Sequence, residues 1–114
     1  MGRTSKAEKK EEKNYLEFSI TGKNNNDFDG RCYKEAHIGD KGAWHALSIT
    51  INGVTIKGSK LWIPNDEAKP VTILWPSYKD KDNKRQPFIA LFKKEDHEDL
   101  QELLENLAGQ LGYN

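Results

Sequence analysis

The sequence predicts an α+β domain in which an antiparallel sheet is followed by one C-terminal amphipathic helix. Apolar and polar residues alternate over residues 15–21 and 44–51, Asn52-Gly53 is a strong hairpin-turn signal, and leucines take a helical spacing after Asp96. We expect five or six strands in a meander, forming either an open sheet or a partly open barrel, with the helix covering one face. The opposite face is then free.

The first half of the chain contains the clearest strands. Over Tyr15–Thr21 the alternation places Leu16, Phe18 and Ile20 on the inner side of a half-buried strand. After it come a polar connection (residues 23–30), a weaker strand candidate (31–38), a break (39–42) and a second alternating strand (44–51) with Leu47, Ile49 and Ile51 inward.

Shorter strands follow, bounded by glycine and proline. We expect a returning strand at 54–56, an interruption at Gly58-Ser59, and a strand at 60–63 that extends to Pro64. The apolar run Val71–Trp75 is typical of a strand near the centre of a sheet, and Pro76 ends it because proline lacks the N–H that a ladder needs. Residues 88–92 are expected to pair with this run.

The helix is predicted by five leucines at i, i+3, i+4, i+7 spacing, namely Leu100, Leu103, Leu104, Leu107 and Leu111. Asp96 is the expected N-cap, acidic residues favour the positive helix start, and Gly109 or Gly112 ends the helix. The leucines can form either an intramolecular core or a dimer seam, and the sequence leaves both open.

The chain divides by composition into a charged N-terminal arm, residues 1–14, and a single domain, residues 15–114. The arm has too few apolar residues to offset the entropy of ordering, so we expect it to be disordered. Formal net charge is zero, but residues 14–94 hold 13 basic and nine acidic residues, whereas residues 95–114 hold six acids and no Lys or Arg. A mildly basic body with an acidic helix permits a basic face.

Composition also limits the class of protein. No apolar run is long enough to cross a bilayer and the N-terminus leads into charge, so we expect a cytoplasmic protein with no membrane association. Cys32 stands alone, which excludes an internal disulfide. Its spacing to His37 and His45 matches no usual zinc motif, and no catalytic or phosphate-loop signature is present. We therefore expect no enzyme activity, metal or cofactor.

The loop over residues 74–87 joins basic and aromatic side chains, which is what nucleic-acid binding needs. Candidate phosphate contacts are Lys57, Lys60, Lys79, Lys81, Lys84 and Arg85, and candidate stacking residues are Trp62, Trp75 and Tyr78. Two plainer interpretations stay open. Each Trp, including Trp44, is more often a core residue than a stacking platform, and the Lys-Asp alternation over residues 79–82 also suits a solubilising hairpin loop.

The order of motifs resembles the SpoVG (stage V sporulation protein G) family over about residues 46–107. The resemblance lies in the hairpin at 47–62, in Trp75-Pro76-Ser77-Tyr78-Lys79-Asp80, in Phe88-Ile89-Ala90 and in the closing acidic helix. It implies a small antiparallel sheet with a helix, dimerisation, and DNA or RNA binding with a regulatory role. The family's basic stretch after Pro-Ser carries over onto Ser77, Lys79 and Lys81, whereas Tyr78 departs from it. Small phage-type single-stranded DNA-binding proteins are a second comparison.

These patterns favour a cytoplasmic or phage-encoded protein that binds single-stranded DNA or RNA with little sequence readout. The alternative is a protein-interaction module that presents its acidic C-terminal helix or a sheet edge to a partner, and either function allows a homodimer.

Overall fold

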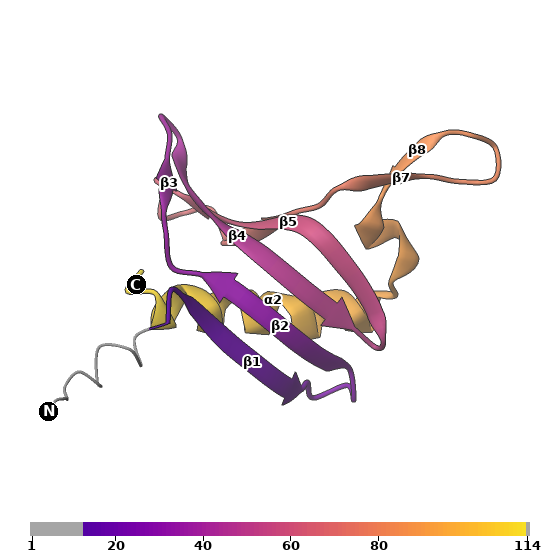
Figure 1. Ribbon diagram of the computed structural model, residues 1–114, viewed down its shortest axis with the longest axis horizontal. Coiled ribbons are helices and arrows are strands. Elements are labelled where there is room, and N and C mark those ends of the chain that lie inside the picture. Colours follow the sequence, from indigo (N-terminus) through magenta and orange to yellow (C-terminus); the bar gives the residue numbers. More distant parts are fainter. Residues whose placement is uncertain (1–12, 114) are drawn as a thin grey trace, which may run out of the picture.

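The computed structural model describes residues 13–113 (Figure 1). The predicted α+β fold is confirmed: six strands form one antiparallel sheet, two more form a separate hairpin, and a long helix follows them. The two end strands of the main sheet are not joined, so the open sheet is the correct form and the barrel is not. Most of the predicted N-terminal arm lies outside the described residues. Within residues 13–113, no helix has the length and apolar character to span a bilayer.

The elements follow one another through short connections. The strands are β1 (Tyr15–Thr21), β2 (Asp27–Tyr33), β3 (His37–Ile38), β4 (Gly42–Ile51), β5 (Val54–Pro64), β6 (Thr72–Leu74), β7 (Ser77–Lys79) and β8 (Arg85–Pro87). The main sheet has the order β1-β2-β4-β5-β6, with β3 paired to the start of β4, while β7 and β8 form the separate hairpin. A short 3₁₀ helix, η1 (Phe88–Leu91), leads into helix α2 (Lys94–Gln110).

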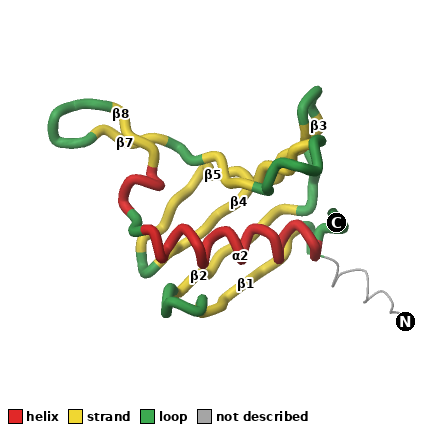
Figure 2. The backbone as a smooth tube through the Cα atoms, turned by 180° about the vertical axis from the view of Figure 1, so that it is seen from behind, coloured by secondary structure: helices red, strands yellow, loops and turns green. Residues whose placement is uncertain are grey.

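Helix α2 lies across one face of the sheet, and the core fills the space between them (Figure 2). The sheet contributes alternate residues of its central strands, among them Leu47, Ile49, Ile51, Ile56 and Leu61, and the helix contributes Leu100, Leu103, Leu104, Leu107 and Ala108. These four leucines therefore belong to an intramolecular core, and Leu111 packs half-buried beside them. No described element covers the opposite face, as predicted.

The predicted interruption at Gly58-Ser59 is a β-bulge inside one continuous strand. Ile56 pairs with Ile49 and Ser59 pairs with Leu47, so two residues of β5 stand opposite one of β4. Gly58 has a φ of 82°, which glycine adopts without the strain of a Cβ. The bulge shifts the alternation by one residue, so that Ile56 and Leu61 both face the helix although an odd number of positions separates them.

Three expectations about the strands are wrong. β2 begins at Asp27 rather than Arg31, and Gly30 lies within it. A Cβ at this position would overlap the backbone carbonyl oxygen of Ser48 in β4, so only glycine fits there. The run 71–75 provides an edge strand rather than a central one, since Pro70 and Pro76 leave few residues able to pair and β5 is the one strand that pairs with β6 among the described residues. Residues 88–91 form η1, where the chain turns from the hairpin into α2 and packs Phe88 and Ile89 on the core.

Helix α2 starts earlier than predicted. Its N-cap is Lys93, not Asp96, and Asp96 accepts a hydrogen bond from the Lys93 backbone N–H (2.8 Å) from its place in the first turn. At the other end Gly112, with a φ of 103°, reverses the chain while the Tyr113 N–H donates to the Ala108 carbonyl (2.9 Å). Gly112 is thus the glycine that ends the helix.

Asp99 joins α2 to the turn between β1 and β2. Its side chain is 2% exposed, and its Oδ2 accepts hydrogen bonds from the Asn24 backbone N–H (2.9 Å) and from Asn26 Nδ2 (2.7 Å). Burial alone would raise the pKa of Asp99, but the hydrogen bonds from Asn26, Asn24 and Lys23 outweigh it, and the pKa lies below its ordinary value. A Cβ on Gly22 would overlap this carboxylate, so the turn depends on both residues.

Candidate nucleic-acid interface

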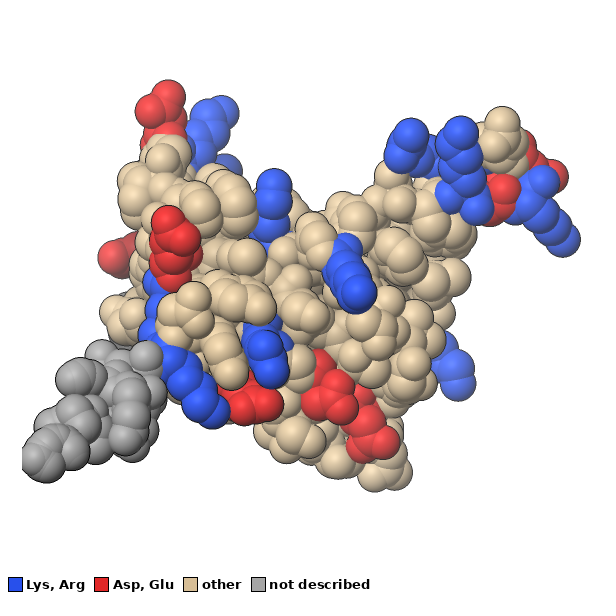
Figure 3. Space-filling view, in the orientation of Figure 1, with Lys and Arg blue, Asp and Glu red and all other residues tan. Residues whose placement is uncertain are grey.

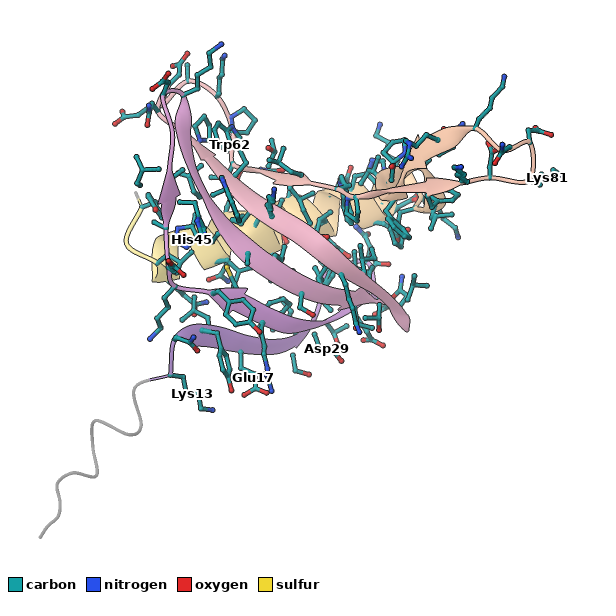
Figure 4. The ribbon with its side chains drawn as sticks, turned by 45° about the horizontal axis from the view of Figure 1, so that its top comes forward. Lys13, Glu17, Asp29, His45, Trp62 and Lys81 are labelled. Carbon is teal, nitrogen blue, oxygen red and sulfur yellow. The ribbon has the colours of Figure 1, made fainter. Side chains whose placement is uncertain are left out.

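The free face of the sheet carries aromatic side chains at the end where β3, β4 and β5 meet. Trp44 and Trp62 are directly opposed in the β4–β5 pair, and both are half-buried. Opposed residues point to the same face, and the buried neighbours Ala43 and Ile63 show that this is the face away from the helix. We name His37, Trp44, Lys60 and Trp62 the aromatic cluster, and Figure 4 shows Trp62 on its strand.

Trp44 is held between two side chains. The His37 ring stacks on it, with 3.9 Å between centroids and 13° between planes, and Lys60 Nζ lies 4.3 Å from its centroid. His37 comes from β3 and Lys60 from β5, which flank β4 on opposite edges, so the two approach the indole from opposite sides. Trp44 therefore holds the Lys60 ammonium at the surface through a cation–π contact. Among residues 13–113, no aromatic ring or cation stacks on Trp62.

The chain leads directly from this cluster to the predicted loop. Thr72 is opposite Trp62 and Leu74 is opposite Lys60, so β6 runs along the cluster from Trp62 toward Lys60. Leu74 is 44% exposed, which extends the apolar surface beside Lys60. Lys57 is exposed at the bulge of β5.

Beyond β6 the chain forms a projecting hairpin, residues 77–87 (Figure 1). From here on, the arm means this hairpin and not the N-terminal segment. Its exposed cations are Lys79, Lys81, Lys84 and Arg85. Lys79 and Arg85 are directly opposed, and Arg85 Nη1 donates to Ser77 Oγ (2.8 Å), so these residues share one side of the hairpin. Figure 3 shows Lys and Arg side chains gathered on the arm in the view that faces the free side of the sheet. Figure 4 shows Lys81 at the far end from Trp62.

Asp80 forms part of the turn at the tip of the arm. Its Oδ1 accepts hydrogen bonds from the backbone N–H groups of Asp82 and Lys84, both at 2.9 Å, and its Oδ2 accepts one from Gln86 Nε2 (3.2 Å). The hydrogen bond from the Lys84 N–H is the largest cause that lowers the pKa of Asp80 below its ordinary value. Within the Lys-Asp alternation, Asp80 therefore has a structural role, because its carboxylate orders the turn that exposes the lysines.

Two of the predicted stacking residues anchor the arm. Trp75 is half-buried against the core, with its ring centroid 6.0 Å from that of Phe92, because the alternation of β6 sends it inward with Val71 and Ile73. Tyr78 is half-buried with its ring 5.3 Å from Phe88. It lies one position from Lys79 in β7, so it points to the other side of the hairpin. Both rings connect the arm to the body.

The other end of the free face is more acidic. Glu17, Asp27 and Asp29 occupy β1 and β2 there, and the cation among them, Arg31, lies 4.5 Å from the Tyr15 ring centroid. Figure 3 shows acidic side chains along this lower edge. An anion would therefore be favoured near the arm, where four exposed cations outnumber Asp80 and Asp82, rather than near β1.

The structure thus brings Lys60 and Trp62 together and places Lys79, Lys81, Lys84 and Arg85 on the arm. Trp44 and His37, which the prediction did not include, belong to the same cluster. The outward position of Trp44 could have been predicted from the alternation of side chains along its strand. Leu47, Ile49 and Ile51 point inward, so Trp44, an odd number of positions away from each of them, points outward. The contact with His37 depends on β3, whose two residues carry too short a pattern to be predicted.

The remaining candidate residues lie under the sheet. His45 is buried, with Nδ1 2.8 Å from the Tyr33 carbonyl oxygen and Nε2 2.8 Å from the Tyr113 hydroxyl. A carbonyl only accepts, so Nδ1 carries the proton and the Tyr113 O–H donates to Nε2. Within residues 13–113, no three His, Cys, Asp or Glu side chains come together as a metal site.

Cys32 is fully buried, and we expect it to be unreactive in the folded protein. Burial raises the pKa of its thiol to about 11, so almost none of the nucleophilic thiolate forms near neutral pH. Labelling with a chromogenic disulfide reagent at about pH 8 should be at least roughly tenfold slower in buffer than in concentrated urea. Equal labelling rates in the two conditions would contradict this burial.

Comparison with protein-family models, with curated proteins and with solved structures found no match to this chain.

Proposed function

We propose that the protein binds single-stranded nucleic acid on the free face of its sheet. The observation that carries this proposal is the aromatic cluster, in which Trp62 offers a half-exposed ring beside an ammonium group that Trp44 holds in place. A base can stack on Trp62 while its phosphate contacts Lys60, and stacking of this kind contributes about 1–3 kcal/mol per base. A base offers its face to a side chain only where it is unpaired and separated from its neighbours, which favours single strands over duplexes.

The proposed mode of binding has little sequence specificity. Phosphate contacts from Lys60, Lys57 and the cations of the arm carry no sequence information, and a stacking surface accepts any base. Trp75 and Tyr78 support the site by fixing the arm, and Ser77 does so by accepting the hydrogen bond from Arg85. DNA and RNA share both the phosphates and the stacking faces, so both are substrates on this proposal.

The test is a titration of a dye-labelled oligothymidylate, followed by fluorescence anisotropy at two salt concentrations. If about three phosphates are neutralised, affinity should fall roughly 20-fold between about 50 and 200 mM salt. Lys60→Ala should weaken binding and reduce the salt slope by about 0.7. The matched control is Lys94→Ala, which removes the same charge from the first residue of α2 on the other side of the sheet. Binding that is absent, or insensitive to salt, would contradict the proposal.

A protein-interaction module is the second candidate, and one surface favours it. An open, largely apolar hollow of about 590 Å³ lies beside the end of α2, lined by Ala43, Ile63, Val71, Ala108 and Tyr113. Ile38 at its rim is 77% exposed. Large exposed apolar groups next to a hollow are typical of contact surfaces. A folded protein that fails to bind any single strand, yet captures a protein partner that Ile38→Asp releases, would support this second function.

A further inference from the structure

We propose, on the basis of the proposed function, that the binding site has two separate parts and that its substrate is an oligonucleotide long enough to reach both. The aromatic cluster would take one or two bases, and the arm would take phosphates farther along the same strand. A mononucleotide or dinucleotide would then bind the cluster alone. The inference rests on where the chain leaves the sheet and on how firmly the arm is fixed.

The two parts are joined by a direct path along the chain. Thr72 stands opposite Trp62, and the nine residues from there to Lys81 run through β6 and β7 toward the tip of the arm. At about 3.3 Å per residue this path is at most ~30 Å long. A single strand with the ~3.4 Å spacing of stacked bases covers that length with about nine nucleotides, and a more extended strand needs fewer. We therefore expect full affinity to require roughly four to nine nucleotides.

The arm is fixed at its base, so its distance from the cluster is set by the fold. Trp75 packs near Phe92, Tyr78 packs near Phe88, and the Phe88 N–H donates to the Pro76 carbonyl oxygen (3.3 Å). At the tip, the Asp80 N–H donates to the Lys84 carbonyl oxygen (2.9 Å), and the Asp80 carboxylate accepts the bonds described above. Contacts made on such a preorganised arm cost little ordering entropy, so a strand that reaches it gains affinity.

The experiment measures affinity against oligonucleotide length for three proteins. They are the wild type, an arm variant carrying Lys79→Ala, Lys81→Ala and Lys84→Ala, and a control carrying Lys23→Ala, Lys93→Ala and Lys94→Ala. The control removes three exposed lysines on the helix side of the sheet, so both variants have the same net charge. Oligothymidylates of about 3, 6, 9 and 12 nucleotides compete with a labelled strand, and circular dichroism confirms that each protein is folded.

For the wild type and the control, affinity should rise at least roughly tenfold between the shortest and the longest strand. For the arm variant the shortest strand should bind as it does to the wild type, and most of the rise should be lost. Longer strands also offer more binding registers, but that statistical gain is the same for all three proteins and cancels in the comparison. If the arm variant weakens all lengths by one factor, or keeps the whole rise, the two-part site is overturned. If the wild type binds none of the strands, the proposed function itself fails.

Discussion

Replacing Trp62 by alanine should lower the affinity for an oligothymidylate by about 10- to 100-fold, since one stacked base contributes roughly 1–3 kcal/mol. Trp62 is the ring of the aromatic cluster on which no described aromatic ring or cation stacks, whereas Trp44 is already held between His37 and Lys60. Trp62→Phe should keep most of the affinity, because phenylalanine retains a flat apolar face. Anisotropy of a labelled strand is the suitable readout, since the substitution removes a tryptophan and changes the intrinsic fluorescence.

Thr72→Ala is the matched control for Trp62. Thr72 lies opposite Trp62 on the same face and is half-buried, so its substitution perturbs the same surface without removing a ring. We expect its affinity to stay within about twofold of the wild type, as a small change at a surface position usually allows. Should Trp62→Ala and Thr72→Ala weaken binding equally, stacking would not be the source of affinity, and the phosphate contacts would have to carry it.

Trp44 should behave differently from Trp62. Its indole positions the Lys60 ammonium, so Trp44→Leu should act mainly through that cation and reduce the salt dependence of binding together with the affinity. Loss of Trp62, by contrast, removes an uncharged contact and should leave the salt slope close to that of the wild type. The two tryptophans are thus separable by the slope even where their effects on affinity are similar.

The sequence predicted those elements whose pattern is local. β1 and β4 follow alternation, the β4–β5 turn follows from Asn52 and Gly53, and α2 follows from its leucines, because in each case the signal lies within one element. The errors arose where a partner in space decides the structure. Residue type places Gly30 in the polar connection, but it pairs within β2, and glycine is needed there because the backbone of β4 leaves no room for a Cβ.

In the candidate site, too, the features set within one strand were predictable and those set by contacts between elements were not. Lys60 and Trp62 were predicted from residue type, and their shared face follows from alternation within β5. The inward position of Trp75 and the packing of Tyr78 on Phe88 depend on where the arm leaves the sheet. The structural use of Asp80 depends on the turn that it helps to form. A count of lysines and aspartates along the arm therefore underestimates how freely the lysines can meet a phosphate.

Replacing Asp99 by asparagine should lower the melting temperature at neutral pH by roughly 10 °C, since buried donors lose a charged acceptor. The carboxylate is 2% exposed and satisfies the Asn24 N–H and the Asn26 side chain, which connect the β1–β2 turn to α2. An asparagine that keeps a carbonyl oxygen in the place of Oδ2 would put its own N–H₂ group in the place of Oδ1, where it meets the donating Asn24 side-chain amide. Glu98→Gln is the matched control, because it removes the same charge from an exposed position of α2 and should change the melting temperature little.

The pH dependence of this difference distinguishes the charge of Asp99 from its shape. The pKa of Asp99 is lower in the folded protein than in the unfolded chain, where an aspartate has a pKa of about 3.9. Its ionised form therefore stabilises the fold in full above that value, and the contribution is lost as the pH falls through the folded-state pKa. The gap in melting temperature between wild type and Asp99→Asn should be widest near neutral pH and should close under strongly acidic conditions, where both side chains are uncharged. A gap that stays constant from neutral to acidic pH would show that packing, and not the charge-assisted hydrogen bonds, makes Asp99 important to the fold.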